Sequence, residues 1–349
     1  MIKRTIVISR RGYIFHKDEQ LHIRMYQREG SIQQGEIERR DGEPRGVSEE
    51  EATVPIEDIG LVVIESHQAT VTASAINALM ENNCVVIGCD AKHLPNSVMY
   101  PIASNTLHTA VLKTQLKASV PLMKQLWQQT VKAKLWNQAA VLRSRGINVK
   151  PMELWAKKVR SGDQGNLEGR GAAYYWRHFP VSSTGDKGGE VERFMRDPEG
   201  EGPNGALNYG YAIIRAAMAR AIVGSGLHPS VGLHHSNQYN PFCLADDLME
   251  PYRPFVDSVI LHLCDEYGGH IEVTPETKKI LLSILSVDTV TEGERKPLML
   301  SMTSTTASLV RCFGGESRKL VYPEVGGIVP DGTGDDRNST PYGESTGED

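Results

Sequence analysis

The sequence has few cysteines and no long hydrophobic run. Its five cysteines, an odd number in a 349-residue chain, argue against a disulfide framework and favour a reducing cytoplasm. Cys84 and Cys89 have no second pair that would complete a zinc site, so we interpret them as small buried side chains. The longest apolar stretch, residues 206–223, is interrupted by Asn208 and two arginines, and none reaches the roughly 18 residues of a membrane span. We therefore expect a cytoplasmic protein with no membrane partner.

Several common functional motifs are also missing. The sequence contains no Walker-type phosphate loop, no Gly-x-Gly-x-x-Gly after a strand and no Gly-x-Ser-x-Gly elbow. It shows no repeat of 20–50 residues, and the apolar run near Met1 is too short for a secretory signal. A nucleotide-binding P-loop, a Rossmann cofactor site and a serine hydrolase therefore have no support in the sequence.

The net charge of −5 is unevenly distributed along the chain. Residues 324–349 contain seven acidic residues against Arg337 alone, a charge of −6, which leaves +1 for residues 1–323. Because this end of the chain has almost no core-forming residues, we predict an acidic disordered tail over 324–349. A near-neutral body can still present a basic face, since phosphate binding depends on local clusters of lysine and arginine.

The first hundred residues predict a β-rich domain. Short apolar or alternating runs at 5–9, 20–25, 61–65 and 84–89 predict strands, and apolar residues at helical spacing predict a helix over 72–81. Residues 33–51 are charged and contain glycine and proline, so we expect an exposed loop there. A chain of this length favours two domains. We predict an α+β fold with a β-rich domain over 1–100 and a larger all-helical catalytic domain over 101–323.

The remaining pattern is helical. We predict helices over 108–145 (broken or kinked at Pro121), 166–178, 206–223, 244–265 and 275–287. Residues 146–165 are expected to form a connector, and residues 180–205 a loop or insertion. Five lysines follow the first helical segment: Lys113, Lys117, Lys124, Lys132 and Lys134. They form either a solvated helix face or a face that contacts phosphates, and the sequence leaves both interpretations open.

The densest group of polar side chains lies between residues 228 and 253. His234 and His235 stand in a short polar loop, and Asp247 and Glu250 are three residues apart in the helix that follows, so both carboxylates should project from one face. Buried carboxylates need a cation, hydrogen bonds or protonation, and a divalent metal is one solution. Oxygen ligands suit magnesium, and one imidazole shifts the preference toward manganese. Two alternatives stay open: a two-histidine iron site, or histidines that bind no metal.

A second cluster surrounds Glu168. Small residues at Gly169, Gly171, Ala172 and Ala173 allow close packing of the helix that carries it. Taken alone, Glu168 in the first helical turn is explained as a carboxylate that favours the helix dipole, worth under roughly 1 kcal/mol.

The two clusters belong to an ordered set of motifs. Gly162-Asp163…Asn166…Glu168, residues 204–211 and residues 232–254 follow in that order, after Arg4-Thr5-Ile6-Val7-Ile8-Ser9 at the start and residues 54–59. Together they closely resemble the CRISPR-associated integrase of spacer acquisition, the first-numbered Cas protein. Leu-Ala-Asp-Asp-Leu-Met-Glu-Pro at 244–251 resembles the type II branch. The resemblance spans roughly residues 1–323.

The resemblance implies which residues form the site. In that family a glutamate, a histidine and an acidic residue hold the catalytic metal, and they match Glu168, His235 and Glu250 here. Asp247 matches a further acidic position near the metal, and His234 is the alternative histidine if the register is off by one. The resemblance further implies DNA contacts by lysines and arginines of the helical domain: Arg253, Lys117 and Lys124.

The implied activity is that of a Mg²⁺- or Mn²⁺-dependent endonuclease and integrase of antiviral defence. It would join the 3′-hydroxyl ends of short duplex DNA, the spacer precursor, to the CRISPR repeat by phosphodiester transesterification. The implied partners are a second copy of the chain paired through the β-rich domain, the small second-numbered Cas protein, and a type II effector nuclease with its accessory proteins. Two rival functions remain: a non-catalytic DNA-binding scaffold, and a stand-alone nuclease for branched DNA.

Overall fold

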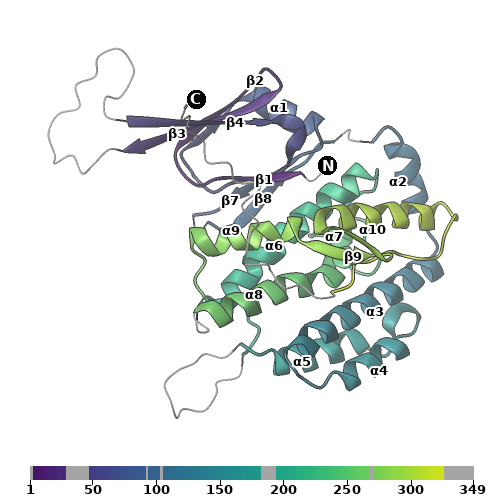
Figure 1. Cartoon of the computed structure of the whole chain (residues 1–349). Coiled ribbons are helices and arrows are strands. Elements are labelled where there is room, and N and C mark those ends of the chain that lie inside the picture. The colour runs from purple at the N-terminus through teal and green to yellow at the C-terminus, as the bar shows by residue number, and fades with distance from the viewer. Residues whose placement is uncertain are drawn as a thin grey trace, which may run out of the picture.

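A computed structural model of the chain describes residues 3–28, 47–91, 93–102, 105–181, 194–267 and 271–325 (Figure 1). Strands gather in the N-terminal part and helices form most of the rest, which confirms the predicted order of a β-rich part followed by a larger helical part. The five cysteines are free. Within the described ranges, no helix is long and apolar enough to cross a membrane.

The N-terminal part contains two four-stranded sheets. The first has the order β1 (Arg4–Ile8), β5 (Ile59–Ile64), β7 (Val85–Cys89) and β8 (Pro95–Met99), with β8 antiparallel to β7. The second has the order β4 (Val47–Pro55), β3 (Gln20–Arg28), β2 (Gly12–Lys17) and β6 (Ala69–Val71). A short 3-10 helix, η1 (Ile56–Asp58), leads into β5, and helix α1 (Ala73–Glu81) follows β6.

The first sheet is buried on both faces. Val62 and Val86 belong to the core of the β-rich part, whereas Leu61, Val63 and Val85 pack into the core of the helical part. Alternate residues of a strand point to opposite faces, so one sheet can serve two cores. This explains why the sequence of β5 and β7 is almost continuously apolar.

The helical part begins with α2 (His108–Leu116) and surrounds one long central helix, α6. Its other elements are α3 (Val120–Ser144), α4 (Lys150–Lys158), η2 (Ser161–Asp163), α5 (Leu167–His178), α6 (Pro203–Gly224), α7 (Cys243–Met249), η3 (Glu250–Tyr252), α8 (Arg253–Tyr267), α9 (Pro275–Ser283), η4 (Ile284–Ser286), β9 (Asp288–Thr291), β10 (Glu294–Pro297) and α10 (Leu298–Phe313). Helix α6 contacts α7, α8, α9 and α10 as well as β7 and β8. It is apolar on nearly all sides, as a central helix must be.

The break expected at Pro121 is confirmed. Helix α2 ends at Leu116 and α3 begins at Val120, where the Ser119 hydroxyl caps the first turn by accepting a hydrogen bond from Leu122 N. Proline is tolerated in this first turn because its missing N–H would have no partner inside the helix.

Other expectations were wrong in detail. The supposed connector 146–165 contains helix α4, and residues 47–51 of the supposed loop 33–51 belong to strand β4, whereas 33–46 lie outside the described residues. The predicted helix 244–265 is interrupted at η3, which contains Pro251. The helical part also contains the β9–β10 hairpin and helix α10, neither of which was predicted.

The predicted acidic tail falls largely outside the described residues, and the predicted loop or insertion 180–205 only in part, since residues 203–205 already belong to α6. Of the predicted acidic tail, Glu324 donates a backbone hydrogen bond to the carbonyl of Val290 in β9, at 2.8 Å, and is therefore part of the fold. The rest of that tail, 326–349, and residues 182–193 of the predicted insertion lie outside the described ranges.

Candidate active site

Lys134 brings two predicted site residues together. Its ammonium nitrogen Nζ lies 2.5 Å from Glu168 Oε1 and 2.5 Å from Glu250 Oε2. Lys134 is 7% exposed on α3, whereas Glu168 comes from the first turn of α5 and Glu250 from η3. Three separate elements therefore converge on one cation position in the interior.

Local structure fixes where Glu168 stands. Asn166, in the left-handed conformation at φ 45°, caps α5 by accepting a hydrogen bond from Gly169 N, and the Asp163 carboxylate accepts from Leu167 N and Glu168 N. Asparagine tolerates this conformation better than most residues. The first turn of α5 is thus held rigidly against α3.

Close packing between α5 and α3 depends on a glycine. A Cβ atom at Gly171 would lie 2.1 Å from Leu135 Cδ2, so a larger residue would push the helices apart. This confirms the packing interpretation for Gly171, whereas Ala173 is exposed. Leu135 follows Lys134 directly, so this contact also sets the distance between Lys134 and Glu168.

Glu250 is held by two cations. Its Oε1 accepts a hydrogen bond from Arg253 Nε at 2.9 Å, while Oε2 is buried and, despite the nearby ammonium of Lys134, accepts no hydrogen bond of good geometry. Burial alone would raise the pKa of Glu250, but Arg253 and Lys134 lower it to about 2. Glu250 is therefore ionised at neutral pH. The same pairing raises the pKa of Lys134 against the effect of its burial.

His235 is oriented by a buried carboxylate. Its Nδ1 lies 2.5 Å from Oδ1 of Asp247, which is fully buried and also accepts hydrogen bonds from Leu233 N and His234 N. The hydrogen bond to Asp247 raises the pKa of His235 against the smaller effect of burial. With Nδ1 engaged, Nε2 is the ring nitrogen left for a metal or substrate, and a carboxylate on the second nitrogen is the usual support of a metal-binding histidine.

The loop that carries His235 requires Gly232. A Cβ at this position would lie 2.4 Å from the carbonyl oxygen of His235 and 2.8 Å from Asp247 Oδ2. The backbone therefore passes too close to the carboxylate for any residue other than glycine.

His234 occupies a different environment from His235. Its ring stacks on Trp127 of α3, with centroids 4.5 Å apart and planes at 4°, and Trp127 also contacts the edge of His235. Both histidines are exposed, His235 to about half, and the ring that is hydrogen-bonded within the fold is that of His235. Trp127 was not identified from the sequence.

The remaining predicted residues are placed as follows. Asp247 and Glu250 have different roles, because Asp247 organises the histidine loop whereas Glu250 faces Lys134 and Arg253. Arg253 is engaged by Glu250 and by the ring of Tyr211, 4.6 Å away. Lys117 and Lys124 are exposed, at the end of α2 and in the first turns of α3. Lys134 lies neither on a solvated helix face nor on a face that contacts phosphates. Both interpretations that the sequence left open for the five lysines are therefore wrong for Lys134.

A pocket of about 190 Å³ lies beside Glu250. Arg196, Arg253 and Tyr211 line it, together with Asp257, which accepts hydrogen bonds from the hydroxyls of Tyr175 and Tyr211. Burial raises the pKa of Asp257 to about 7, and the two tyrosine hydroxyls oppose that rise. Neither Arg196 nor Asp257 was identified from the sequence; the tyrosines that bind Asp257 are 82 and 46 residues away along the chain.

The residues fit a divalent cation at the Glu168–Glu250 position. Two carboxylates already share one cation there, and the buried Glu250 Oε2 without a hydrogen bond is an oxygen that a metal would satisfy. In the part of the chain that the structure describes, however, no three His, Cys, Asp or Glu side chains converge closely enough to hold an ion. The carboxylate pair is therefore formed around Lys134, and the histidine stands apart from it.

Comparison with known proteins gives a consistent result. The family model described as CRISPR-associated protein Cas1 matches residues 13–270. A CRISPR-associated endonuclease Cas1 of Neisseria meningitidis serogroup C is 39% identical over 279 residues, 79% of this chain and 88% of the relative. Among solved structures, a casposase bound to its integration product has a TM-score of 0.68 at 20% identity, covering 91% and 92% of the two chains. A Cas6–RT–Cas1–Cas2 complex contains a chain with a TM-score of 0.62 at 16% identity, covering 91% of this chain and 35% of that one.

Proposed function

The chain belongs to the CRISPR-associated Cas1 family, and on that premise we propose that it is a metal-dependent DNA integrase and endonuclease of spacer acquisition. The observation that carries the proposal is the meeting of Glu168 and Glu250 at one buried cation position. A carboxylate pair and a histidine that another carboxylate orients are ligand types that suit the metal of a phosphodiester-transfer site.

Glu168, Glu250 and His235 would hold the metal. When bound, Mg²⁺ or Mn²⁺ supplies Lewis-acid stabilisation of the charge that develops on the scissile phosphodiester. Asp247 keeps Nδ1 of His235 occupied, so that Nε2 is the nitrogen available for binding. Arg253 offsets the charge of Glu250 and keeps it ionised.

The proposed reaction exchanges one phosphodiester for another. The 3′-oxygen of the incoming short duplex forms a bond to phosphorus at the repeat boundary and loses its proton. The bond from phosphorus to the 3′-oxygen of the target strand breaks, and that oxygen takes up a proton to become a free 3′-hydroxyl. With water as the attacking group, the same site would act as an endonuclease.

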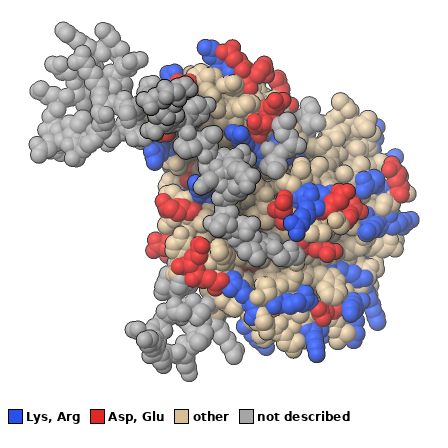
Figure 2. Space-filling model, viewed as in Figure 1, with Lys and Arg blue, Asp and Glu red and all other residues tan. Residues whose placement is uncertain are grey.

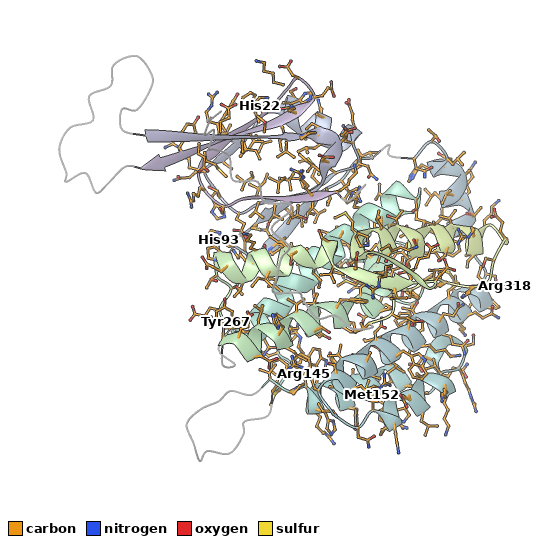
Figure 3. The ribbon with its side chains drawn as sticks, in the orientation of Figure 1. His22, His93, Arg145, Met152, Tyr267 and Arg318 are labelled. Carbon is orange, nitrogen blue, oxygen red and sulfur yellow. The ribbon has the colours of Figure 1, made fainter. Side chains whose placement is uncertain are left out.

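A basic surface beside the site supports DNA as the substrate. Figure 2 shows lysines and arginines gathered along the lower part of the molecule, where Figure 1 places α3, α4 and α5. Helix α4 is amphipathic: Met152, labelled in Figure 3, is fully buried, whereas Lys157 and Lys158 are exposed. On α4, on α5 and between these two helices, the exposed basic residues are Lys150, Lys157, Lys158, Arg160, Arg170 and Arg177.

These cations are not neutralised by their acidic neighbours. Of the acidic residues between 150 and 177, Glu153 pairs with Arg143, Asp163 caps α5 and Glu168 pairs with Lys134. Aromatic side chains lie among the cations, with Lys157 over the ring of Trp136. A basic surface interleaved with aromatic residues suits the phosphate backbone of a nucleic acid.

Charge reversal tests this surface. We expect the double variant Lys157→Glu and Lys158→Glu to bind duplex DNA more weakly, with a salt dependence shallower by about 0.9 for each lost phosphate contact. The matched control is Lys279→Glu on the exposed side of α9. Equal losses of DNA affinity in the double variant and in Lys279→Glu would refute α4 as a DNA-binding surface.

The proposed partners come from the family. The solved Cas6–RT–Cas1–Cas2 complex, which contains a chain of this fold, supports assembly with the small protein Cas2. We further propose a homodimer that pairs through the β-rich part and contacts with a type II effector nuclease and its accessory proteins. We propose that the protein acts in the cytoplasm in antiviral defence.

Strand transfer tests the whole proposal. A labelled short duplex is incubated with a supercoiled plasmid carrying a leader and repeat, with purified Cas2 and either Mn²⁺ or EDTA. We expect transfer only with metal, loss of transfer in His235→Ala, and full transfer in His262→Ala, whose imidazole pairs with Glu266 on its own helix. Tight DNA binding without metal-dependent transfer or cleavage would favour the scaffold. Cleavage of branched DNA that needs neither Cas2 nor the repeat would favour a stand-alone nuclease.

A further inference from the structure

A second cavity, of about 200 Å³, lies where the β-rich and helical parts meet. The β-rich part contributes Lys3 and Asn83, and the helical part contributes Arg220 of α6 and the first turn of α10. None of its lining residues belongs to the candidate active site. The cavity therefore has a separate chemistry.

Two cations face this cavity with few partners. Arg220 is only 8% exposed, and its Nε donates a hydrogen bond to the carbonyl of Asn83 at 2.5 Å, while Lys3 Nζ donates to the carbonyl of Asn82 at 3.1 Å. Across the described residues, neither side chain has a carboxylate within ion-pair distance. Burial lowers the pKa of both groups, and Arg220 lowers that of Lys3 further. Two like charges held together in a partly buried space create a demand for an anion.

Helix α10 adds to this positive potential. It begins beside the cavity, its first turn contains no acidic residue, and no side chain caps it. A helix N-terminus carries a partial positive charge and free N–H groups that favour anions. The opposing end of α6 is largely neutralised, since its last carbonyls accept hydrogen bonds from Ser225 N, Gly226 N and Asn105 Nδ2.

The cavity also contains an unsatisfied polar group. Asn83 Oδ1 is buried and has no hydrogen-bond partner. Rotating this amide by 180° would place its NH₂ group, which can donate two hydrogen bonds, where Oδ1 now lies. Ser225 and Thr303 also line the cavity, although the Thr303 hydroxyl donates to the carbonyl of Met299 and the Ser225 hydroxyl is paired with that of Thr306.

Close contacts at Gly60 keep the two parts together here. A Cβ at Gly60 of β5 would lie 2.8 Å from Lys3 Cβ and 3.1 Å from Met299 Sδ. Glycine thus allows the start of the chain and the start of α10 to approach the same strand. As a result, Lys3 of the β-rich part faces the same cavity as Arg220 and the start of α10 in the helical part.

We propose that this cavity binds a small phosphate anion, and that the bound anion joins the β-rich part to the helical part. The Arg220 guanidinium, the Lys3 ammonium and the N–H groups of the first turn of α10 after Leu298, whose own N–H donates to Val287 O, form a donor set that recognises a tetrahedral oxyanion. At about 30 Å³ for each water molecule, the cavity has room for about seven waters, so it admits inorganic phosphate and is too small for a length of DNA.

Thermal unfolding of the full chain tests this site. Inorganic phosphate is compared with chloride at matched ionic strength, in EDTA so that metal binding plays no part. Phosphate should raise the melting temperature in a saturable way, because a ligand of the folded state stabilises it. We expect Lys3→Gln to weaken the phosphate Kd about tenfold, as for loss of one charged hydrogen bond, and Lys279→Gln on exposed α9 to leave it unchanged.

Three results would overturn the proposal. The first is a melting temperature that responds equally to phosphate and chloride. The second is a phosphate response of equal size in Lys3→Gln and Lys279→Gln; the Lys3 variant is preferred to one at Arg220, whose hydrogen bond to Asn83 also supports the fold. The third is a shift caused by a hydroxyl-ended oligonucleotide and abolished by Lys3→Gln, which would make backbone DNA the ligand instead of a small anion.

Discussion

Replacing Lys134 by methionine tests how the carboxylate pair is held together. Methionine keeps most of the length and apolar stem of lysine but removes the ammonium that lies 2.5 Å from both Glu168 and Glu250. Removing one partner of a buried ion pair costs about 3–5 kcal/mol. Glu168 is about a third exposed and Glu250 keeps Arg253, so we expect the lower end, about 3 kcal/mol in EDTA. At roughly 2 °C per kcal/mol, the melting temperature should fall by about 6 °C.

Manganese should reverse this loss in the variant. The two carboxylates no longer share an ammonium, so a divalent cation meets no competing charge and should bind Lys134→Met more tightly than the wild type. Calorimetric Mn²⁺ titration and melting curves with Mn²⁺ or EDTA measure both effects. Lys132→Met, on the same helix and without an ion pair among the described residues, is the control. If Lys134→Met has the stability of the wild type in EDTA and the same Mn²⁺ affinity, the reasoning is refuted. If the wild type, Lys134→Met and Lys132→Met all fail to bind Mn²⁺, the proposed metal site is refuted instead.

Three further substitutions test the surroundings of the site. Gly232→Ala should displace the histidine loop, because the new Cβ would lie 2.4 Å from the His235 carbonyl, and strand transfer should fall more than DNA binding. Asp247→Asn should cost about 1–3 kcal/mol in urea denaturation, because Oδ2 accepts from Leu233 N and His234 N while Oδ1 pairs with His235, and an amide has only one acceptor oxygen for these partners. Asp257 has a folded pKa of about 7, above its ordinary 3.8, so the stability it contributes is full below pH 3.8 and is lost as pH rises toward 7. Asp257→Asn should therefore flatten unfolding free energy between pH 4 and 7, and an unchanged pH profile would contradict this assignment.

The sequence predicted the elements whose ends carry clear signals. Thr72 caps α1 by accepting a hydrogen bond from Ala75 N, and Asn166 caps α5 in the same way. Pro121 and Gly224 stand where α3 begins and α6 ends. Such signals are local, so a single sequence contains them in full.

The missed elements lack local signals of this kind. Helix α10 is rich in serine and threonine, which favour other conformations in isolated chains. Its Ser301, Thr305 and Ser308 are fully buried because each finds a hydrogen-bond partner in the fold. Helix α4 is short, with glycines nearby on both sides, and its apolar face is narrow. Tertiary contacts stabilise both helices, and these contacts join residues that are distant in the sequence.

The role of Lys134 could have been inferred from its phase in the helix. Along α3, the buried residues Trp127, Thr130 and Val131 precede Lys134, and Asn137 and Gln138 follow it at helical spacing. A lysine in the buried phase of a helix must meet an anion, because an unpaired interior charge is too costly. Taken alone, Glu250 was expected to need a cation and Glu168 was explained by the helix dipole, and only the family resemblance joined the two. A buried lysine needs an anion, and a buried carboxylate needs a cation. Combining these two requirements would have placed Glu168 and Glu250 around Lys134. A lysine on the buried side of a helix is therefore as informative about a carboxylate site as the carboxylates themselves.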